Sequence, residues 1–141
     1  MTHVLDIEAH HIEVRGLKEP IVQAYEVLRW GFTIAPVIAG LDKFFHLLVN
    51  WDQYLAPQIA SILPFSGHTF MLLVGVVEIV AGIGVLLKPR IFAYVVAAWL
   101  LGIIINLLIA GAYFDIALRD LGLALGALAL GRLSRHFEEA A

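Results

Sequence analysis

The stretch IFAYVVAAWLLGIIINLLIAGAYF, residues 91–114, contains no charged side chain over 24 positions. A transmembrane helix needs about 20 predominantly apolar residues, so this stretch is long enough to cross a bilayer with some tilt. A surface helix of a soluble bundle would need a polar face, and this stretch has none. The stretch therefore favours a membrane protein.

Three further apolar segments accompany this stretch in the chain of 141 residues. Between the first two segments, Tyr54, Leu55 and Ile59 indicate a short helix in the membrane interface, with Pro57 in its first turn. Pro20 is well placed to begin the first long helix. The predicted fold is all-α, a polytopic membrane four-helix bundle over residues 20–135 with a short interfacial helix in the outer loop, spans at about residues 28–49, 69–87, 91–113 and 115–133, and polar tails at residues 1–19 and 136–141.

The composition agrees with a membrane protein and excludes several other classes. The chain is 61% hydrophobic and only 15% charged, whereas a soluble domain is about 45–50% apolar and about 25% charged. The net charge of −3 offers no electrostatic footprint for nucleic acid. Because the chain has no cysteine, disulfides and thiolate metal sites are excluded.

The basic residues predict the orientation of the bundle. Seven of the nine fall on one side of a four-span topology: Arg15, Lys18, Arg29, Lys88, Arg90, Arg132 and Arg135. The positive-inside rule then places both termini in the cytoplasm. We expect an integral membrane protein of a bacterial inner membrane.

Polar residues inside the predicted spans share helical faces with small residues. Charged groups in lipid are costly unless they are buried and paired, and small residues mark close helix contacts. The predicted inward stripes are Pro36, Gly40, Lys43 and Leu47; Met71, Gly75, Glu78 and Gly82; Val95, Trp99, Gly102 and Asn106; and Asp115, Arg119, Gly122, Gly126 and Ala129. We therefore expect one intramembrane polar cluster in the outer half of the bundle, formed by Asp42, Lys43, Glu78, Asn106, Arg119 and Asp120.

This cluster has three open interpretations. It could hold the four helices in one arrangement, bind a small amphipathic ligand such as a quinone head group or a lipid, or move protons or ions. His46 and His68 lie near the outer surface and could contribute to it. The sequence contains no recognisable metal-ligand spacing, so we expect no metal and no covalently bound cofactor.

Three short motifs resemble the DoxX-like family of small four-helix membrane proteins. They are LRWG at residues 28–31, GLDKF at residues 40–44 and EIVAGIGVL at residues 78–86. By this resemblance, Arg29, Lys43 and Glu78 match the recurrent polar positions of the family. Members include the membrane subunit of an archaeal thiosulfate:quinone oxidoreductase and components of bacterial membrane oxidoreductase complexes, and distant relatives act as membrane chaperones or cargo receptors.

The favoured function is a small non-catalytic accessory subunit that stabilises or assembles a larger redox or electron-transfer complex. It would contact the bilayer and its partner through helix faces and the N-terminal tail, and would not bind nucleic acid. One alternative is a quinone-interacting subunit of an oxidoreductase of the DoxX or DoxD type, in which Lys43, Glu78 or Arg119 hydrogen-bonds the quinone. Another is a stand-alone membrane chaperone or transporter.

Overall fold

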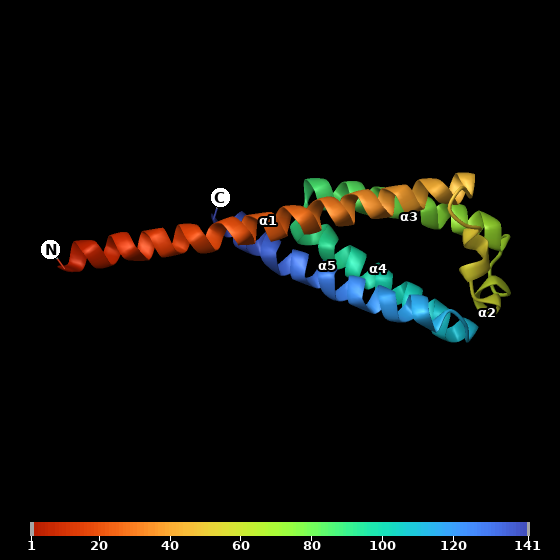
Figure 1. The fold of residues 1–141 in the computed structure, drawn as a ribbon. Coiled ribbons are helices and arrows are strands. Elements are labelled where there is room, and N and C mark those ends of the chain that lie inside the picture. Colours follow the sequence, from red (N-terminus) through yellow and green to blue (C-terminus); the bar gives the residue numbers. More distant parts are fainter. Residues whose placement is uncertain (1, 141) are drawn as a thin grey trace.

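The chain folds into helices joined by short connections (Figure 1). The computed structural model describes residues 2–140, and describes side chains over residues 19–137. In chain order, the helices are α1 (Thr2–Phe45), the 3-10 helix η1 (Trp51–Tyr54), α2 (Pro57–Ala60), α3 (Gly67–Leu87), α4 (Pro89–Ala110) and α5 (Phe114–Ala140). Residues 2–140 contain no strand, so the prediction of an all-α fold is confirmed.

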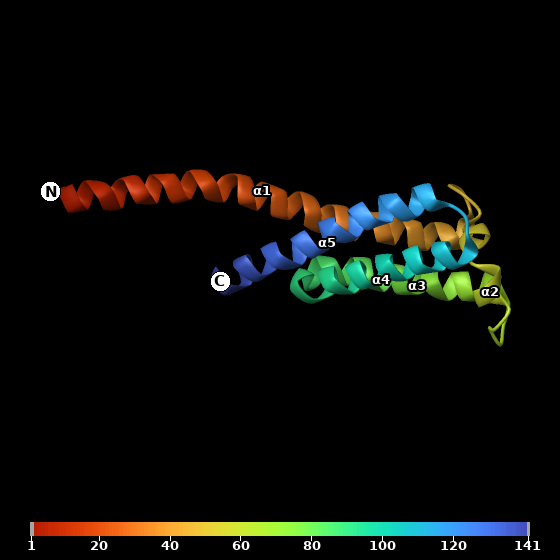
Figure 2. The ribbon, with the colours of Figure 1, turned by 90° about the horizontal axis from the view of Figure 1, so that it is seen from below.

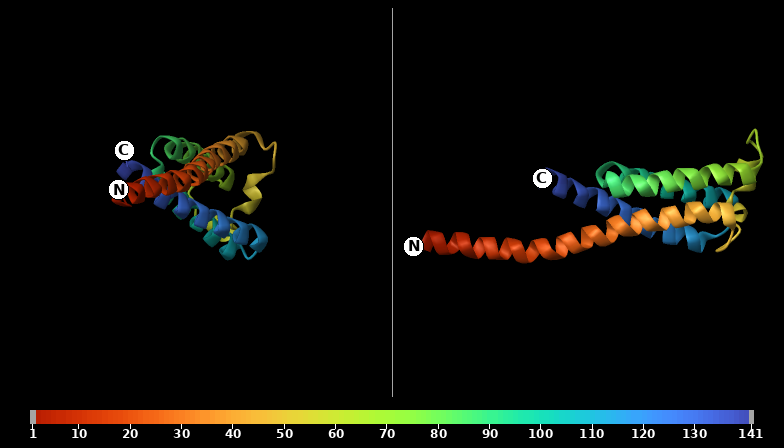
Figure 3. Two further views of the ribbon diagram at one scale, coloured as in Figure 1. Left: turned by 60° about the vertical axis from the view of Figure 1, so that its left-hand side comes forward. Right: turned by 90° about the horizontal axis from the view of Figure 1, so that it is seen from above.

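The first helix is longer than the sequence predicts. The helix start predicted at Pro20 is wrong, because α1 runs through both Pro20 and Pro36 without ending. An interior proline removes one backbone hydrogen bond and bends a helix, but the turns on either side can continue it. The 44 residues of α1 extend about 66 Å at 1.5 Å per residue. The N-terminal part of α1 projects beyond the other helices and curves gently (Figures 2 and 3).

The ends of the other helices follow local sequence signals. The Ser66 hydroxyl accepts a hydrogen bond from the Thr69 N–H at 3.1 Å and so caps the start of α3. Pro89 occupies the first turn of α4, and Gly111 ends that helix in the left-handed conformation with φ of 69°. Pro57 begins α2, so the short helix predicted between the first two long helices is confirmed.

The four long helices pack as two pairs, α1 with α3 and α4 with α5. The pairs lie close together at the end that holds the C-terminus and the α3–α4 turn, which we call the terminal end (Figure 1). They diverge toward the end that holds η1 and α2, which we call the loop end. One apolar core joins α3, α4 and α5, and it consists of Ala81, Val85, Ala93, Val96, Ala97, Ala127 and Leu130.

Several charged side chains are buried in this bundle, and many large apolar side chains face outward. Lys43 and Glu78 are buried at 3% and 7% exposure, and Asp42 and Asp120 are buried as well. Large apolar side chains face outward instead, as in the case of Leu118, which is 71% exposed. Soluble proteins rarely bury charged groups fully and do not expose large contiguous apolar surfaces.

The inward stripe is predicted correctly on α3, where all four of its residues are buried: Met71, Gly75, Glu78 and Gly82. On α1, Gly40 and Lys43 are buried, whereas Leu47 lies beyond the end of the helix and is 84% exposed. The stripe on α4 is only partly right. Trp99 and Asn106 are half-buried there, but Val95 and Gly102 face outward.

The stripe predicted on α5 is wrong. Asp115, Arg119, Gly122 and Ala129 are exposed and Gly126 is half-buried. The buried face of the helix consists of Ala117, Asp120, Ala124, Ala127, Leu130, Gly131 and Ser134. Small residues occur on more than one face of this helix, so their spacing does not identify the side that packs. The buried carboxylate of Asp120 marks that side.

Two helices of the described chain, α3 and α4, are long and apolar enough to cross a membrane by length and composition. Core helices of soluble proteins can pass the same test, so this supports membrane association only weakly. The four-span bundle therefore stays a prediction.

Candidate functional site

A buried ion pair joins α1 to α3. The Lys43 ammonium lies 2.8 Å from Oε2 of Glu78, and the two side chains are 3% and 9% exposed. The pair forms where the backbones of the two helices approach closely, because a Cβ atom added at Gly40 would lie 2.5 Å from the carbonyl oxygen of Gly75. Glycine at this crossing thus brings Lys43 and Glu78 within hydrogen-bond distance.

An indole ring covers the Lys43 ammonium from the loop end. The ammonium lies 4.0 Å from the ring centroid of Trp51, in a cation–π contact. The Trp51 indole N–H donates to Oδ2 of Asp42 at 2.8 Å. Lys43 therefore has two kinds of partner, the Glu78 carboxylate and the aromatic face of Trp51.

Asp42 acts as a cap for the end of α1 and makes no ion pair with Lys43. Its carboxylate accepts backbone hydrogen bonds from the N–H groups of Leu47 at 2.9 Å and Leu48 at 3.0 Å, in addition to the Trp51 bond. Consecutive side chains on a helix diverge, so Asp42 and Lys43 face different neighbours. This network fixes the path of the chain from α1 into η1.

Asp120 of α5 adds a second carboxylate near the ion pair. It is 5% exposed and close enough to Glu78 for their charges to interact. The Nε atom of Arg119 lies 3.5 Å from Asp120 Oδ1, but the Arg119 side chain is 67% exposed. Arg119 is therefore at the edge of the cluster, in contrast to the predicted inward position.

The indole N–H of Trp99 on α4 is also close to Glu78. The Nε1 atom is buried and makes no hydrogen bond of standard geometry to a described residue, and the Glu78 carboxylate is the acceptor that it approaches. Buried indole N–H groups usually find a partner. The described structure thus brings Lys43, Glu78, Asp120 and Trp99 together from four different helices.

Asn106 makes its hydrogen bonds to the backbone of the loop end. Its Oδ1 accepts a hydrogen bond from the Ala56 N–H at 2.9 Å, and its Nδ2 donates to the Tyr54 carbonyl at 2.6 Å. Ala56 is completely buried. Asn106 therefore ties the segment between η1 and α2 to α4.

His46 and His68 lie next to each other, with ring centroids 5.8 Å apart and nearly parallel planes. Nδ1 of His68 is 2.7 Å from Oδ2 of Asp52. Both histidines were candidates from the sequence, whereas Asp52, which comes from η1, carries no sequence signal for this position. The sequence also gives no sign that the Trp51 ring contacts Lys43 or that Trp99 lies beside Glu78.

Arg29 is the third polar residue that matches the family motifs. Its partners are not Lys43 or Glu78. Its guanidinium donates to the Leu86 carbonyl with distances of 2.7 Å from Nη2 and 3.2 Å from Nε. It also lies 3.5 Å from Glu26. Arg29 thus satisfies a carbonyl at the end of α3, which is where a cation is favourable.

No protein-family model, curated protein or solved structure matches the chain. The resemblance to the DoxX-like family stays a prediction that rests on the quoted motifs.

Proposed function

We propose that the protein is an integral-membrane four-helix bundle that acts as a non-catalytic subunit of a larger membrane complex. The buried charged side chains and the many exposed large apolar side chains support the membrane part. Apolar residues face outward on α1 and α5 as well as on the two most apolar helices, as shown by Ile34 at 50% and Leu125 at 60% exposure. Lipid accommodates such faces, and it favours charges that are buried and paired inside the bundle.

The basic residues support one orientation in the membrane. The C-terminus and the α3–α4 turn, with Lys88 and Arg90, lie at the terminal end (Figure 1). Arg132 and Arg135 are near the same end of α5. By the positive-inside rule, the terminal end is cytoplasmic and the loop end lies on the opposite side of a bacterial inner membrane.

The observation that carries the subunit role is an apolar groove on the outward face of α1. It is lined by Gly31, Ile34, Ala35, Ile38, Ala39 and Leu48. Three of these are small residues spaced four apart, which is the pattern that lets a second transmembrane helix approach closely. A Cβ atom added at Gly31 would meet no atom within 4 Å, so the groove is open to a partner.

The projecting part of α1 supports the same role. The hydrocarbon core of a bilayer is roughly 30 Å thick, whereas α1 extends about 66 Å. The remainder provides a helical surface outside the membrane for a larger protein. The DoxX-like resemblance makes a redox or electron-transfer complex the proposed partner.

The test compares two forms of the full chain, the unsubstituted protein and the double variant with Gly31→Leu and Ala35→Leu. Each is purified from native membranes in a mild detergent. We expect the unsubstituted protein to purify in constant stoichiometry with larger membrane proteins, and the double variant to lose them while remaining helical. Gly102→Leu is the matched control, because Gly102 is exposed on α4 and its Cβ would also meet no atom within 4 Å. A stand-alone protein with activity of its own would contradict the proposal.

A quinone-interacting subunit is the second candidate, and the indole N–H of Trp99 favours it. This donor is buried beside the Glu78 carboxylate and makes no hydrogen bond of standard geometry among the described residues, so a carbonyl oxygen would compete with Glu78 for it. Trp99→Phe and Glu78→Gln should lower quinone turnover by the complex without changing its composition. Unchanged turnover in both variants would exclude quinone binding at this position.

A further inference from the structure

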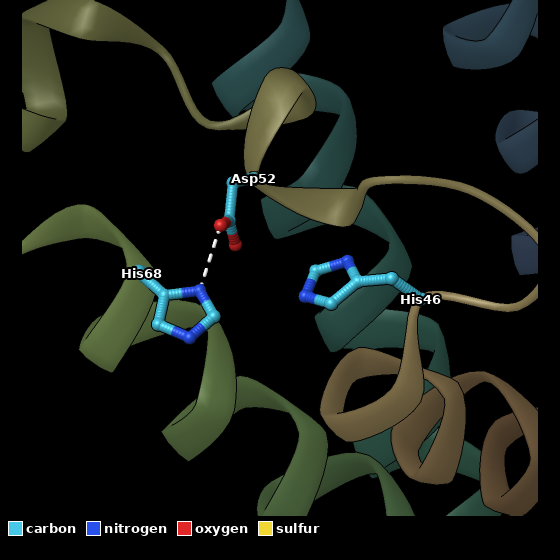
Figure 4. Close-up of side chains that lie close together, drawn as sticks. All are labelled: His46, Asp52 and His68. Atoms are coloured by element: carbon cyan, nitrogen blue, oxygen red, sulfur yellow. Dashed lines mark hydrogen bonds and ion pairs between the residues drawn. The ribbon is translucent and has the colours of Figure 1, made fainter.

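We propose that His46, Asp52 and His68 form a binding site for a divalent transition-metal ion of the zinc class at the loop end. Each residue offers one ligand atom, and these atoms all lie within 4.8 Å of one another. Figure 4 shows the nitrogen-bearing edge of the His46 ring facing Asp52 and His68. The residues come from the end of α1, from η1 and from the first turn of α3. The metal site is independent of the proposed role as a subunit.

The backbone that carries the first two ligands is held in place. His46 has a φ of 53°, a left-handed conformation that non-glycine residues adopt rarely. Its N–H donates to the Asp42 carbonyl at 2.6 Å, and the Asp42 carboxylate binds Leu47, Leu48 and Trp51. Asp42 therefore serves as a positioning residue that turns the chain so that His46 and Asp52 face the same point.

The third ligand is positioned by the start of α3. His68 follows the Ser66 cap by two residues, and its Nδ1 is 2.7 Å from Oδ2 of Asp52. Nδ1 of His46 and Oδ1 of Asp52 are buried and have no hydrogen-bond partner among the described residues. Buried polar atoms normally have partners, and functional sites are a recurring exception. Two unpaired atoms within one three-residue cluster indicate that the cluster binds a ligand.

The donor set selects the class of ion. Two imidazole nitrogens and one carboxylate oxygen suit zinc and other first-row transition metals, whereas calcium and magnesium prefer oxygen ligands. With metal–ligand bonds of about 2.0–2.2 Å, tetrahedral ligand atoms lie roughly 3.4 Å apart. The His68–Asp52 pair, at 2.7 Å, must therefore open slightly, and since no two ligand atoms are more than 4.8 Å apart, any that lie too far apart need to approach by at most about 1.4 Å.

The three protein ligands leave one coordination position. The His68 side chain is 54% exposed, so the site is accessible from the surroundings of the loop end. Three protein ligands with one remaining position are the arrangement of zinc sites that also bind water or a substrate. The ion would in addition join α1, η1 and α3, which close the loop end.

The test uses the purified full chain in detergent, without a histidine tag, after chelator treatment and titration with Co²⁺. We expect one equivalent to bind with the intense visible bands of four-coordinate cobalt, and Zn²⁺ to displace it. His46→Ala and His68→Ala should each abolish these bands, and Asp52→Asn should weaken binding by at least about tenfold. The matched control removes the other four histidines of the chain, His3, His10, His11 and His136, and should bind as the unsubstituted protein does.

A second measurement uses the unsubstituted protein, so it tests the proposed metal site even if a variant fails to fold. Electron spin-echo modulation of the unsubstituted protein with one equivalent of Cu²⁺ should detect two coordinated imidazoles. Zn²⁺ should also raise its unfolding temperature, since an ion that binds only the folded state stabilises it. The site is overturned if the variant without His46 and His68 binds Co²⁺ as before, or if the unsubstituted protein binds none at micromolar concentration.

Discussion

At the terminal end of the bundle, the helices pack through apolar side chains, and Val85 and Leu130 are completely buried among alanines. Toward the loop end, the helices α1 and α3 are joined by the buried ion pair of Lys43 and Glu78. The two regions differ in what makes them specific. Inside lipid, apolar packing gains little from the hydrophobic effect, so the fit between the side-chain shapes determines which helix faces associate. A buried ion pair accepts only one partner, because an unpaired charge inside the bundle is costly.

The two kinds of contact also join different helices. The apolar core joins α3 to α4 and α5, while Lys43 and Glu78 join α1 to α3. Two separate sets of hydrogen bonds then close the loop end, one between Trp51 and Asp42 and one from Asn106 to the backbone of Tyr54 and Ala56. The bundle thus uses shape where its helices converge and charge or hydrogen bonds where the pairs diverge.

The largest effect is expected from Glu78→Ala. This change leaves the Lys43 ammonium buried without its carboxylate and should lower the free energy of unfolding by about 3–5 kcal/mol. The measurement is unfolding by sodium dodecyl sulfate in mixed micelles, followed by circular dichroism.

Replacing both partners is the control for this prediction. Lys43→Met combined with Glu78→Leu removes the charges together and should cost much less than Glu78→Ala, since apolar replacements of buried pairs are often neutral. An equal loss in the double variant would show that helix packing at this point depends on the side-chain shapes and not on the charges.

A cavity at the terminal end should have the next largest effect. Leu130→Ala removes a completely buried side chain and should destabilise the protein by about 2–5 kcal/mol. Leu128→Ala is the matched control on the same helix, because Leu128 is 41% exposed and its truncation should change stability by at most about 0.5 kcal/mol. Similar losses in the two variants would contradict the assignment of the packed face of α5.

The long helices and the inward positions of Lys43 and Glu78 could be predicted from the sequence for a physical reason. On α3, Glu78 is the only charged residue and shares its face with Gly75 and Gly82, so polarity and small size mark the same side. On α5, small residues occupy several faces, and the charged pair at positions 119 and 120 offers two choices. Only packing resolves that choice, in favour of Asp120.

The loop end could be predicted less well, because its contacts depend on backbone geometry. Asp52 approaches His68 across 16 positions only after the chain has turned at His46. Hydrophobic periodicity carries no information about that turn. The start of α1 was predicted wrongly for a related reason, since proline is common at a helix start and is also tolerated inside a long helix.

Trp51→Phe tests the link between the ion pair and the loop end. Phenylalanine keeps an aromatic face near Lys43 but removes the indole N–H that binds the Asp42 carboxylate at 2.8 Å. Loss of a hydrogen bond to a charged group should cost about 1.5–3 kcal/mol of unfolding free energy. Trp30→Phe is the control, because Trp30 is 47% exposed, and it should leave the unfolding transition unchanged.

Asn106→Ala should change the free energy of global unfolding least among these variants, and its effect should be confined to the loop end. It removes the partners of the Ala56 N–H and the Tyr54 carbonyl, and a buried group left without a partner costs about 1–3 kcal/mol. Amide hydrogen exchange should therefore speed up over residues 51–60 while the terminal-end core stays protected. Asn106→Asp keeps the acceptor oxygen and removes the donor, so it should restore the slow exchange of Ala56 in part. If exchange rises equally at both ends, the loop end is not closed by this side chain, and the two regions unfold as one unit.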